Sequence, residues 1–452
     1  MSQPGASPPS ASMPRVTEAG LGDAPPLPES RSRLRRALDL RAAVALGVGG
    51  TIGGGIFVLI GTAAGRAGPA VLVAFGLAFV ASGLIALPYA ELACRYPTAG
   101  GGYAFAHAVL GRDWGFLMGW DYWGAYVFLS GYVTLGFGGY LHTLTGLPTT
   151  ACALGLVLAI TVLNLGGVRL SGTVQTGIVA LVLVSLVGFG LLGLPHLQAA
   201  NFSPFFSRGA SGVVAAALLA FLSFGGFDMI AAAGEEVQDP ERTLPRAIVL
   251  TLLLVLGVYL LVTVVAVGIL SAGALGGSLA PLADAAGRAF GGAGRRFVAL
   301  AAVLTTAATA NAVLLVTSRI SFAMARDGLL PSPIGRVRDE TGVPWVAVLM
   351  NGTLLALVAL TGSITLAATI GGFLYVLHFV VPLASLVRLR RRRIGQPAFQ
   401  TPLPWIVLPL AFAGCLVLVV ASGATGFLGG IGWLLLGVVL YLVARRIRRS
   451  AV

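Results

Sequence analysis

Twelve apolar runs recur along the 452-residue chain, and most of them are long enough to cross a lipid bilayer. A helix that spans the hydrocarbon core needs about 20 apolar residues. Lipid offers no hydrogen-bond partners, so the backbone of each span must be satisfied internally. We therefore expect an all-α integral membrane protein with twelve transmembrane helices. The runs occupy residues 41–65, 69–91, 114–142, 149–167, 173–195, 211–234, 246–271, 296–325, 344–361, 365–389, 402–421 and 425–444.

The composition excludes a soluble protein and gives no support to a metalloenzyme. Charged residues make up 10% of the chain, against about 25% in soluble domains. The three cysteines and four histidines are scattered, with neither a disulfide framework nor metal-ligand spacing. We therefore expect no resident cofactor. No nucleotide-binding motif is present, so we expect no transport driven by ATP through this chain alone.

Arginine placement predicts the orientation. All 29 basic residues are arginines, and 24 of them fall in segments that are cytoplasmic if the N-terminus is cytoplasmic. We expect a multi-pass protein of the cell membrane with both termini in the cytoplasm and no nucleic-acid partner. Residues 1–36 are expected to form a disordered cytoplasmic tail, and residues 445–452 a basic cytoplasmic one. The five outer arginines are Arg66, Arg208, Arg288, Arg295 and Arg296.

The first apolar run is rich in glycine. Six of the nine residues from Gly47 to Gly55 are glycines, each costing about 1 kcal/mol relative to Ala in a helix interior. Two half-helices with an unwound stretch around Thr51–Gly55 would avoid this cost. The freed N–H groups would lie at the positive end of the second half-helix, where a carboxylate binds well. Close packing of neighbouring helices on the glycines is the alternative.

The sixth run carries a matching interruption. Gly225 and Gly226 break an aromatic-rich stretch, and Asp228 follows within membrane depth. Interrupted first and sixth spans predict two inverted five-helix repeats, about residues 41–195 and 211–390, with a substrate site between them. Freed carbonyls would hold a cation and freed N–H groups an anion, so a zwitterion such as an amino acid suits both.

Four motifs together resemble the amino acid permeases of the amino acid–polyamine–organocation (APC) superfamily, in the branch similar to cationic amino acid transporters. The resemblance covers roughly residues 38–390. The motifs are Thr51-Ile-Gly-Gly-Gly-Ile-Phe57, the segment from Pro88 to Tyr103, Gly226-Phe-Asp228 with the segment from Glu235 to Arg246, and the segment from Ser318 to Pro331.

The resemblance implies a LeuT-type 5+5 inverted-repeat fold with broken helices 1 and 6. Residues 37–390 would form a ten-helix core, and residues 391–444 two peripheral helices. The substrate carboxylate would meet the N–H groups of the first break, and the amino group would meet carbonyls of both breaks. The implied residues are Gly53, Gly54 and Gly55 for the carboxylate, and Thr51, Ile52, Leu222 and Gly225 for the amino group.

The chain departs from the family pattern at the gate. Many relatives have an aromatic residue where this chain has Leu222. Aromatic neighbours are the alternative gate residues, and Asp228 is the best proton-coupling residue by sequence, although it would equally serve to hold the break open. The aromatic candidates are Phe221, Phe224 and Phe227.

A second departure concerns the coupling ion. Sodium-independent relatives often carry a lysine on the fifth helix, but this chain has no lysine and Val182 lies near that position. Ala302, Thr305 and Thr306 have the spacing that puts one carbonyl and two hydroxyls on one helix face. The resemblance implies a sodium site made by these three residues with Gly49 and Ile52, and plain packing is the alternative.

The other polar residues have simpler expected roles. We expect Glu91 to pair with Arg95, and Asp121 to be a structural partner at a helix start. Trp114, Trp120, Tyr122 and Trp123 are expected in an interfacial belt. His107 and His378 are residues that could titrate near neutrality, but a lone histidine is more often simply hydrogen-bonded.

These features predict a secondary active α-amino acid transporter that works by alternating access, either a symporter coupled to Na⁺ or H⁺ or an antiporter. Its expected partners are a small amino acid substrate and the lipid bilayer. An organic amine or polyamine transporter of the same fold is the alternative, and a membrane amino acid sensor is a more distant one. The sequence indicates neither the transported side chain nor the oligomeric state.

Overall fold

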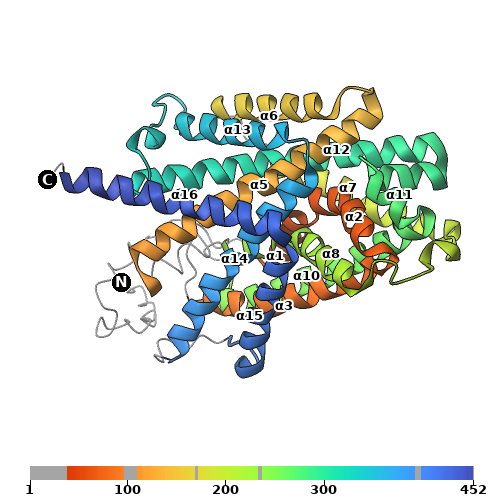
Figure 1. The fold of residues 1–452 in the computed structure, drawn as a ribbon, viewed down its shortest axis with the longest axis horizontal. Helices are drawn as coiled ribbons and strands as arrows, with labels where there is room; N and C mark the ends of the chain where they lie inside the picture. Colours follow the sequence, from red (N-terminus) through yellow and green to blue (C-terminus); the bar gives the residue numbers. More distant parts are fainter. Residues whose placement is uncertain (1–37, 96–108, 168–171, 233–236, 392–398, 451–452) are drawn as a thin grey trace, which may run out of the picture.

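The computed structural model describes residues 38–95, 109–167, 172–232, 237–391 and 399–450 (Figure 1). The expected tail of residues 1–36, the motif residues 96–103 and His107 lie outside this part. Within it the chain is helical, and the only β-type pairings are two isolated bridges, Leu38 with Val237 and Arg338 with Val343. The expected all-helical architecture is confirmed.

Every apolar run of the sequence coincides with a helix or a pair of helices. The longer helices are α1 (Leu40–Thr51), α2 (Gly54–Ala67), α3 (Val71–Arg95), α5 (Arg112–Thr145), α6 (Thr149–Leu165), α7 (Gly172–Gly193), α8 (Gly209–Ser223), α10 (Pro240–Ile269), α12 (Pro281–Arg326), α13 (Trp345–Leu360), α14 (Ile364–Arg391), α15 (Pro404–Ala421) and α16 (Gly423–Ser450). The short ones are α9 (Phe227–Ala232), α11 (Ala272–Gly277) and the 3₁₀ turns η1 (Gly68–Ala70), η2 (Leu194–His196), η3 (Ala199–Phe202) and η5 (Ser332–Gly335).

The molecule is a multi-pass membrane protein. In the described part, seven helical segments are long and apolar enough to span a bilayer, or eight if the pair α5 and α6, bent by 116°, is one span. Three further apolar helices, α1, α8 and α13, are shorter. Helices α1 and α8 are short because the first and sixth runs are interrupted.

Both interruptions lie at the glycines that the sequence indicated. Helix α1 ends at Thr51 and α2 begins at Gly54. Helix α8 ends at Ser223 and α9 begins at Phe227, with Gly226 at a φ of 124° between them. This φ favours glycine, because a Cβ atom is strained there.

The two interruptions touch each other. A Cβ atom on Gly226 would lie 2.7 Å from the carbonyl carbon and oxygen of Gly50 and 2.8 Å from the nitrogen of Thr51. A Cβ atom on Gly55 would lie 2.9 Å from the Cα atom of Ser223. Glycine at these positions therefore lets the backbones of the two breaks approach within van der Waals contact.

Helix α5 runs through the middle of the molecule and packs along α12 and α14, while α6 and α13 lie side by side at one edge (Figure 1).

Helix α16 crosses α5 at a tryptophan junction. Trp120 Nε1 donates to the carbonyl of Trp433 (2.8 Å), and Trp433 Nε1 donates to the carbonyl of Trp120 (3.1 Å). Trp120 and Trp123 are buried in this junction, so the interfacial belt predicted for them is wrong. Of that group, Trp114 is the exposed one.

The contact between the breaks predicts that Gly226→Ala destabilises the protein. The positive φ alone costs about 1–3 kcal/mol, and the methyl group would overlap the backbone of Gly50. The matched control is Gly257→Ala, because nothing lies within 4 Å of a Cβ atom there. Thermal unfolding in detergent should show a lower midpoint for Gly226→Ala only. Equal midpoints would contradict the close approach.

Candidate functional site

A cavity of about 70 Å³ lies where the two interrupted helices meet. This volume exceeds the roughly 10–15 Å³ that one water molecule needs. Helices α5, α12 and α14 close its remaining sides. Its lining residues are Gly50, Thr51, Gly53, Gly54, Gly55, Tyr126, Leu129, Tyr132, Val133, Leu222, Gly225, Gly226, Thr309, Val313 and Tyr375. Six of the seven substrate residues predicted from the sequence are in this set, whereas Ile52 is not.

The start of α2 presents backbone donors to the cavity. The N-terminal cap is Gly53, which has no side chain to cap the helix. Its own N–H donates to the carbonyl of Thr51 (2.9 Å). Gly54 and Gly55 open the helix, so no preceding helical turn accepts their N–H groups. These two groups, at the positive end of the helix dipole, are suited to a carboxylate.

The same glycines also pack closely against three other helices. A Cβ atom on Gly53 would lie 2.8 Å from Thr309 Oγ1 of α12, and one on Gly54 would lie 3.0 Å from Val133 Cγ1 of α5. Gly55 faces Ser223 of α8. Both sequence interpretations therefore hold, because these glycines border the cavity and allow close packing.

Tyr259 of α10 ties the two breaks together. Its hydroxyl lies 2.8 Å from the carbonyl oxygen of Ser223 and 3.0 Å from that of Thr51. The single hydroxyl proton is shared between the last carbonyls of α8 and α1, of which that of Thr51 also accepts from the N–H of Gly53. The sequence analysis did not identify Tyr259, and its only sequence signal is a tyrosine in the middle of an apolar run.

Asp228 lies behind the cavity wall. Its side chain is buried, and Oδ1 accepts from the N–H of Gly226 (3.1 Å) and from the hydroxyl of Tyr375 (3.2 Å). Oδ2 lies 3.3 Å from the donating hydroxyl of Tyr126. These bonds hold the α8–α9 break in place. Tyr126 and Tyr375 are cavity residues that the sequence analysis missed, because they lie on helices without a recognisable motif.

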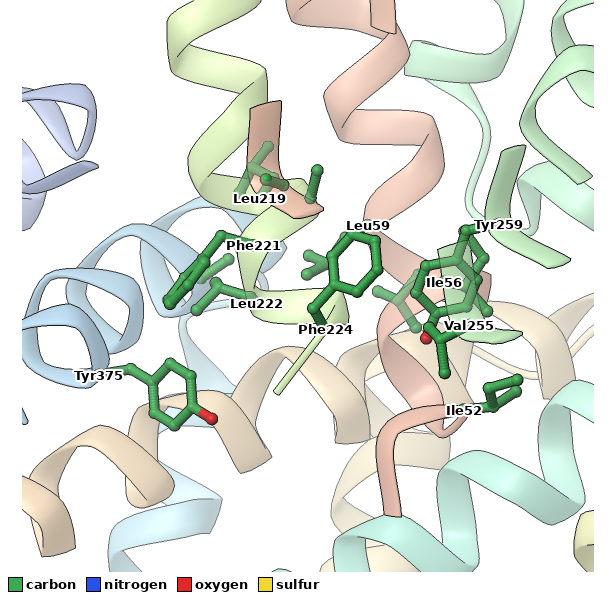
Figure 2. Packing of buried hydrophobic residues seen from close by; sticks show 14 of the residues in the cluster. Ile52, Ile56, Leu59, Leu219, Phe221, Leu222, Phe224, Val255, Tyr259 and Tyr375 are labelled. Atoms are coloured by element: carbon green, nitrogen blue, oxygen red, sulfur yellow. The ribbon is translucent and has the colours of Figure 1, made fainter. Parts of the chain in front are cut away.

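The three phenylalanines near the second break do not line the cavity. Phe221 points toward Tyr375 (ring centroids 6.0 Å apart), and Phe224 packs against Tyr259 (5.3 Å) (Figure 2). Phe227 stacks on Phe379 at 5.4 Å. Leu222 does line the cavity. The aromatic side chains that border it are Tyr126, Tyr132 and Tyr375.

The residues considered for sodium lie in the packed interface between the first break and α12. Ala302, Thr305, Thr306 and Ile52 are buried. The hydroxyl of Thr306 donates to the carbonyl of Ala302 (2.6 Å), and its methyl carbon faces Gly54. The residue beside Gly49 is Val179, 3.1 Å from a Cβ atom built there, rather than Val182. In the described part, no three His, Cys, Asp or Glu residues cluster as metal ligands.

Glu91 forms a larger network than the expected pair with Arg95. That pair is present at 2.7 Å, and the fully buried carboxylate also accepts from Arg390 of α14. The N–H and hydroxyl of Thr401 complete its partners, at 2.8 and 2.7 Å. This cluster ties the end of α3 to α14 and to the segment before α15. Asp121 is also buried, but its Oδ1 has no hydrogen-bond partner in the described structure.

Comparison with known proteins agrees with this architecture. A family model described as amino acid permease matches residues 38–442. The branched-chain amino acid permease BcaP of Bacillus subtilis (strain 168) is 31% identical, covering 91% of this chain and 94% of that protein. Cationic amino acid transporter 4 of Homo sapiens is 32% identical, covering 83% of this chain and 64% of that protein. The methylthioribose transporter of Bacillus subtilis (strain 168) is 29% identical, covering 92% and 95%.

The family match and the transporters among the relatives show a membrane transporter rather than an enzyme. The chain belongs to the amino acid permease family of the APC superfamily. The resemblance read from its four motifs is thereby confirmed.

The bridge made by Tyr259 predicts a specific effect of Tyr259→Phe. Losing one hydrogen bond costs about 0.5–1.5 kcal/mol, so substrate should bind about 2–10-fold more weakly as the breaks separate. Tyr140→Phe is the control, because its hydroxyl also donates to a backbone carbonyl, that of Phe57 (2.7 Å), which lies inside α2 and not at either break. Equilibrium binding of a labelled amino acid measures the substrate affinity of both variants. Equal affinities in the two variants would contradict a role for Tyr259 in shaping the site.

Proposed function

We propose that this protein is a secondary active transporter that moves an α-amino acid across the cell membrane by alternating access. The observation that carries this proposal is the cavity lined by residues of both breaks, next to the glycines Gly54 and Gly55 that open α2. The carboxylate would bind at Gly53, Gly54 and Gly55, mainly through the N–H groups of the last two. The amino group would bind at carbonyls among Thr51, Ile52, Leu222 and Gly225.

The proposed fold is a LeuT-type arrangement of twelve spans in two inverted five-helix repeats, with α15 and α16 peripheral. Two observations support this arrangement. All twelve apolar runs coincide with helices, and in the described residues the first and sixth runs are the ones that are interrupted, each at glycines. The arginine distribution supports cytoplasmic termini. Alternating access would move the interrupted helices relative to α5 and α12.

The cavity lining supports a substrate with a neutral, apolar side chain. Leu129, Val133 and Val313 provide aliphatic walls, and Leu222 stands where many relatives have an aromatic residue. None of the lining residues carries a charge. The nearest carboxylate, Asp228, has both oxygens engaged by hydrogen bonds. The similarity to the branched-chain amino acid permease BcaP agrees with such a substrate.

Competition for uptake tests the substrate class. A cationic side chain in an apolar wall costs about 2.5–3.5 kcal/mol on membrane scales, or roughly a hundredfold in affinity. In liposomes containing the purified protein, we expect unlabelled leucine and valine to inhibit uptake of labelled leucine, and arginine and putrescine to leave it unchanged. Transport of putrescine but of no amino acid would favour the alternative, an organic amine transporter that uses Asp228 as a counter-charge.

Sodium is proposed as one coupling ion, bound by Gly49, Ile52, Ala302, Thr305 and Thr306. Burial of Ile52, Ala302, Thr305 and Thr306 supports the proposal, whereas the bond from Thr306 to its own helix favours plain packing. Proton coupling and exchange are the alternatives.

The sodium proposal predicts that replacing both Thr305 and Thr306 by Ala lowers uptake in sodium to the level seen without sodium. Thr353→Ala is the control, because its hydroxyl also donates within its helix, to Leu349 at 2.9 Å, at an exposed site. Uptake in liposomes with and without a sodium gradient makes the comparison. Unchanged sodium dependence in the double variant would contradict the proposal.

A further inference from the structure

His378 of α14 is a buried titratable group without a hydrogen bond. Its side chain is 1% exposed, and neither Nδ1 nor Nε2 has a hydrogen-bond partner in the part of the chain that the structure describes. The sequence led us to expect an ordinary hydrogen-bonded histidine. Buried polar atoms are almost always paired, so an imidazole with two unpaired nitrogens in the protein interior calls for a functional explanation.

His378 belongs to the same cluster of rings as the cavity wall. Its ring stacks on Tyr122 of α5, with centroids 4.3 Å apart and planes at 24°. Tyr122 contacts Tyr126 edge-on at 4.7 Å, and Tyr126 donates to Asp228. On its own helix, His378 lies 6.4 Å from the ring of Tyr375, which donates to the same carboxylate. A chain of contacts therefore joins the imidazole to two lining residues.

The titratable groups around this chain of contacts are few. Helix α5 contributes Tyr122 and Tyr126, and Asp121 precedes Tyr122 in sequence. Helix α9 contributes Asp228, and α3 contributes Tyr89, whose ring packs on Phe379 beside His378. The carboxylate of α3, that of Glu91, is bound by Arg95 and Arg390. Between residues 404 and 442, α15 and α16 contain no Asp, Glu, His or Arg, and α8 contains none between residues 209 and 223.

We propose that His378 is the proton-binding group that couples proton movement to substrate transport. The proposal rests on the proposed function and takes its proton-coupled alternative. When the site is open to one side, a proton from water adds to the lone pair of the unprotonated ring nitrogen and forms an imidazolium. When the site opens to the other side, the proton returns to water there. Each cycle then moves one proton with one substrate.

The aromatic contact of His378 would stabilise a positive charge, which burial in the protein interior otherwise disfavours. The face of an aromatic ring attracts cations, and the face of Tyr122 lies against the imidazole. The carboxyl group of Asp228 belongs to the same cluster through its hydrogen bonds with Tyr126 and Tyr375. Because His378 is closed to water in this structure, a proton can enter or leave only when the site opens, which prevents a leak.

Uptake driven by a pH gradient tests the proposal. Liposomes containing the full-length protein are loaded at equal sodium on both sides, and labelled leucine uptake is measured with and without an acidic outer solution. One pH unit supports at most about tenfold accumulation when one proton accompanies each substrate. We expect the wild type to respond to the gradient, and His378→Gln, which cannot titrate, to lose that response. His142→Gln is the control, because His142 is exposed and bonds only locally, to Leu147.

Counterflow separates this proposal from the proposed function. Exchange of labelled for unlabelled leucine at equal pH needs no gradient, so it should persist in His378→Gln. Gradient-driven accumulation in His378→Gln equal to that of the wild type would overturn the role of His378. Counterflow without any response to pH in the wild type would also overturn it, but would leave the proposed function intact. Absence of counterflow for every amino acid tested would overturn the proposed function itself.

A measurement on the wild type alone keeps the proposal testable if His378→Gln does not fold. A pH-sensitive dye trapped inside the liposomes reports protons that enter with substrate. Adding leucine outside should acidify the interior at equal starting pH. An unchanged interior pH during measurable leucine uptake would overturn the proposal.

Discussion

The contact between the two interrupted helices is the constraint on which the rest of the structure depends. Gly226 lies against the backbone of Gly50 and Thr51, and Gly55 lies against Ser223. A side chain at either glycine would separate the breaks. Unsatisfied backbone groups at helix ends would be costly in lipid. Because the backbones meet, these helix ends face one another, the hydroxyl of Tyr259 and the cavity. Tyr259 satisfies carbonyls from both sides at once.

A second layer of polar groups keeps this arrangement in place. Asp228 places a carboxyl group at membrane depth, where an isolated charge is expensive. It accepts hydrogen bonds from the N–H of Gly226 and from the hydroxyls of Tyr126 and Tyr375, and an aromatic cluster lies beyond them. The cluster extends to His378, so the site that would hold the substrate and the group proposed to hold the proton share one set of side chains. Coupling between them then needs no long path.

The sequence predicted the parts that depend on local chemistry. Glycine clusters predicted both interruptions, because unwinding follows from the residues at the break itself. The apolar runs predicted the helices for the same reason. Tyr259, Tyr126 and Tyr375 were missed, because their roles depend on which helices pack together. The extension of the Glu91 network to Arg390 and Thr401 joins residues about 300 positions apart, and no local pattern reveals it. The belt predicted for Trp120 and Trp123 was wrong because α16 covers these residues.

The most direct test of the central claim is an experimental structure of the protein with leucine bound. The account predicts ligand density between the start of α2 and the end of α8, with the carboxylate at the N–H groups of Gly54 and Gly55 and the side chain toward Leu129 and Val133. Leucine bound elsewhere, with the space between the two breaks filled by protein or water, would contradict it.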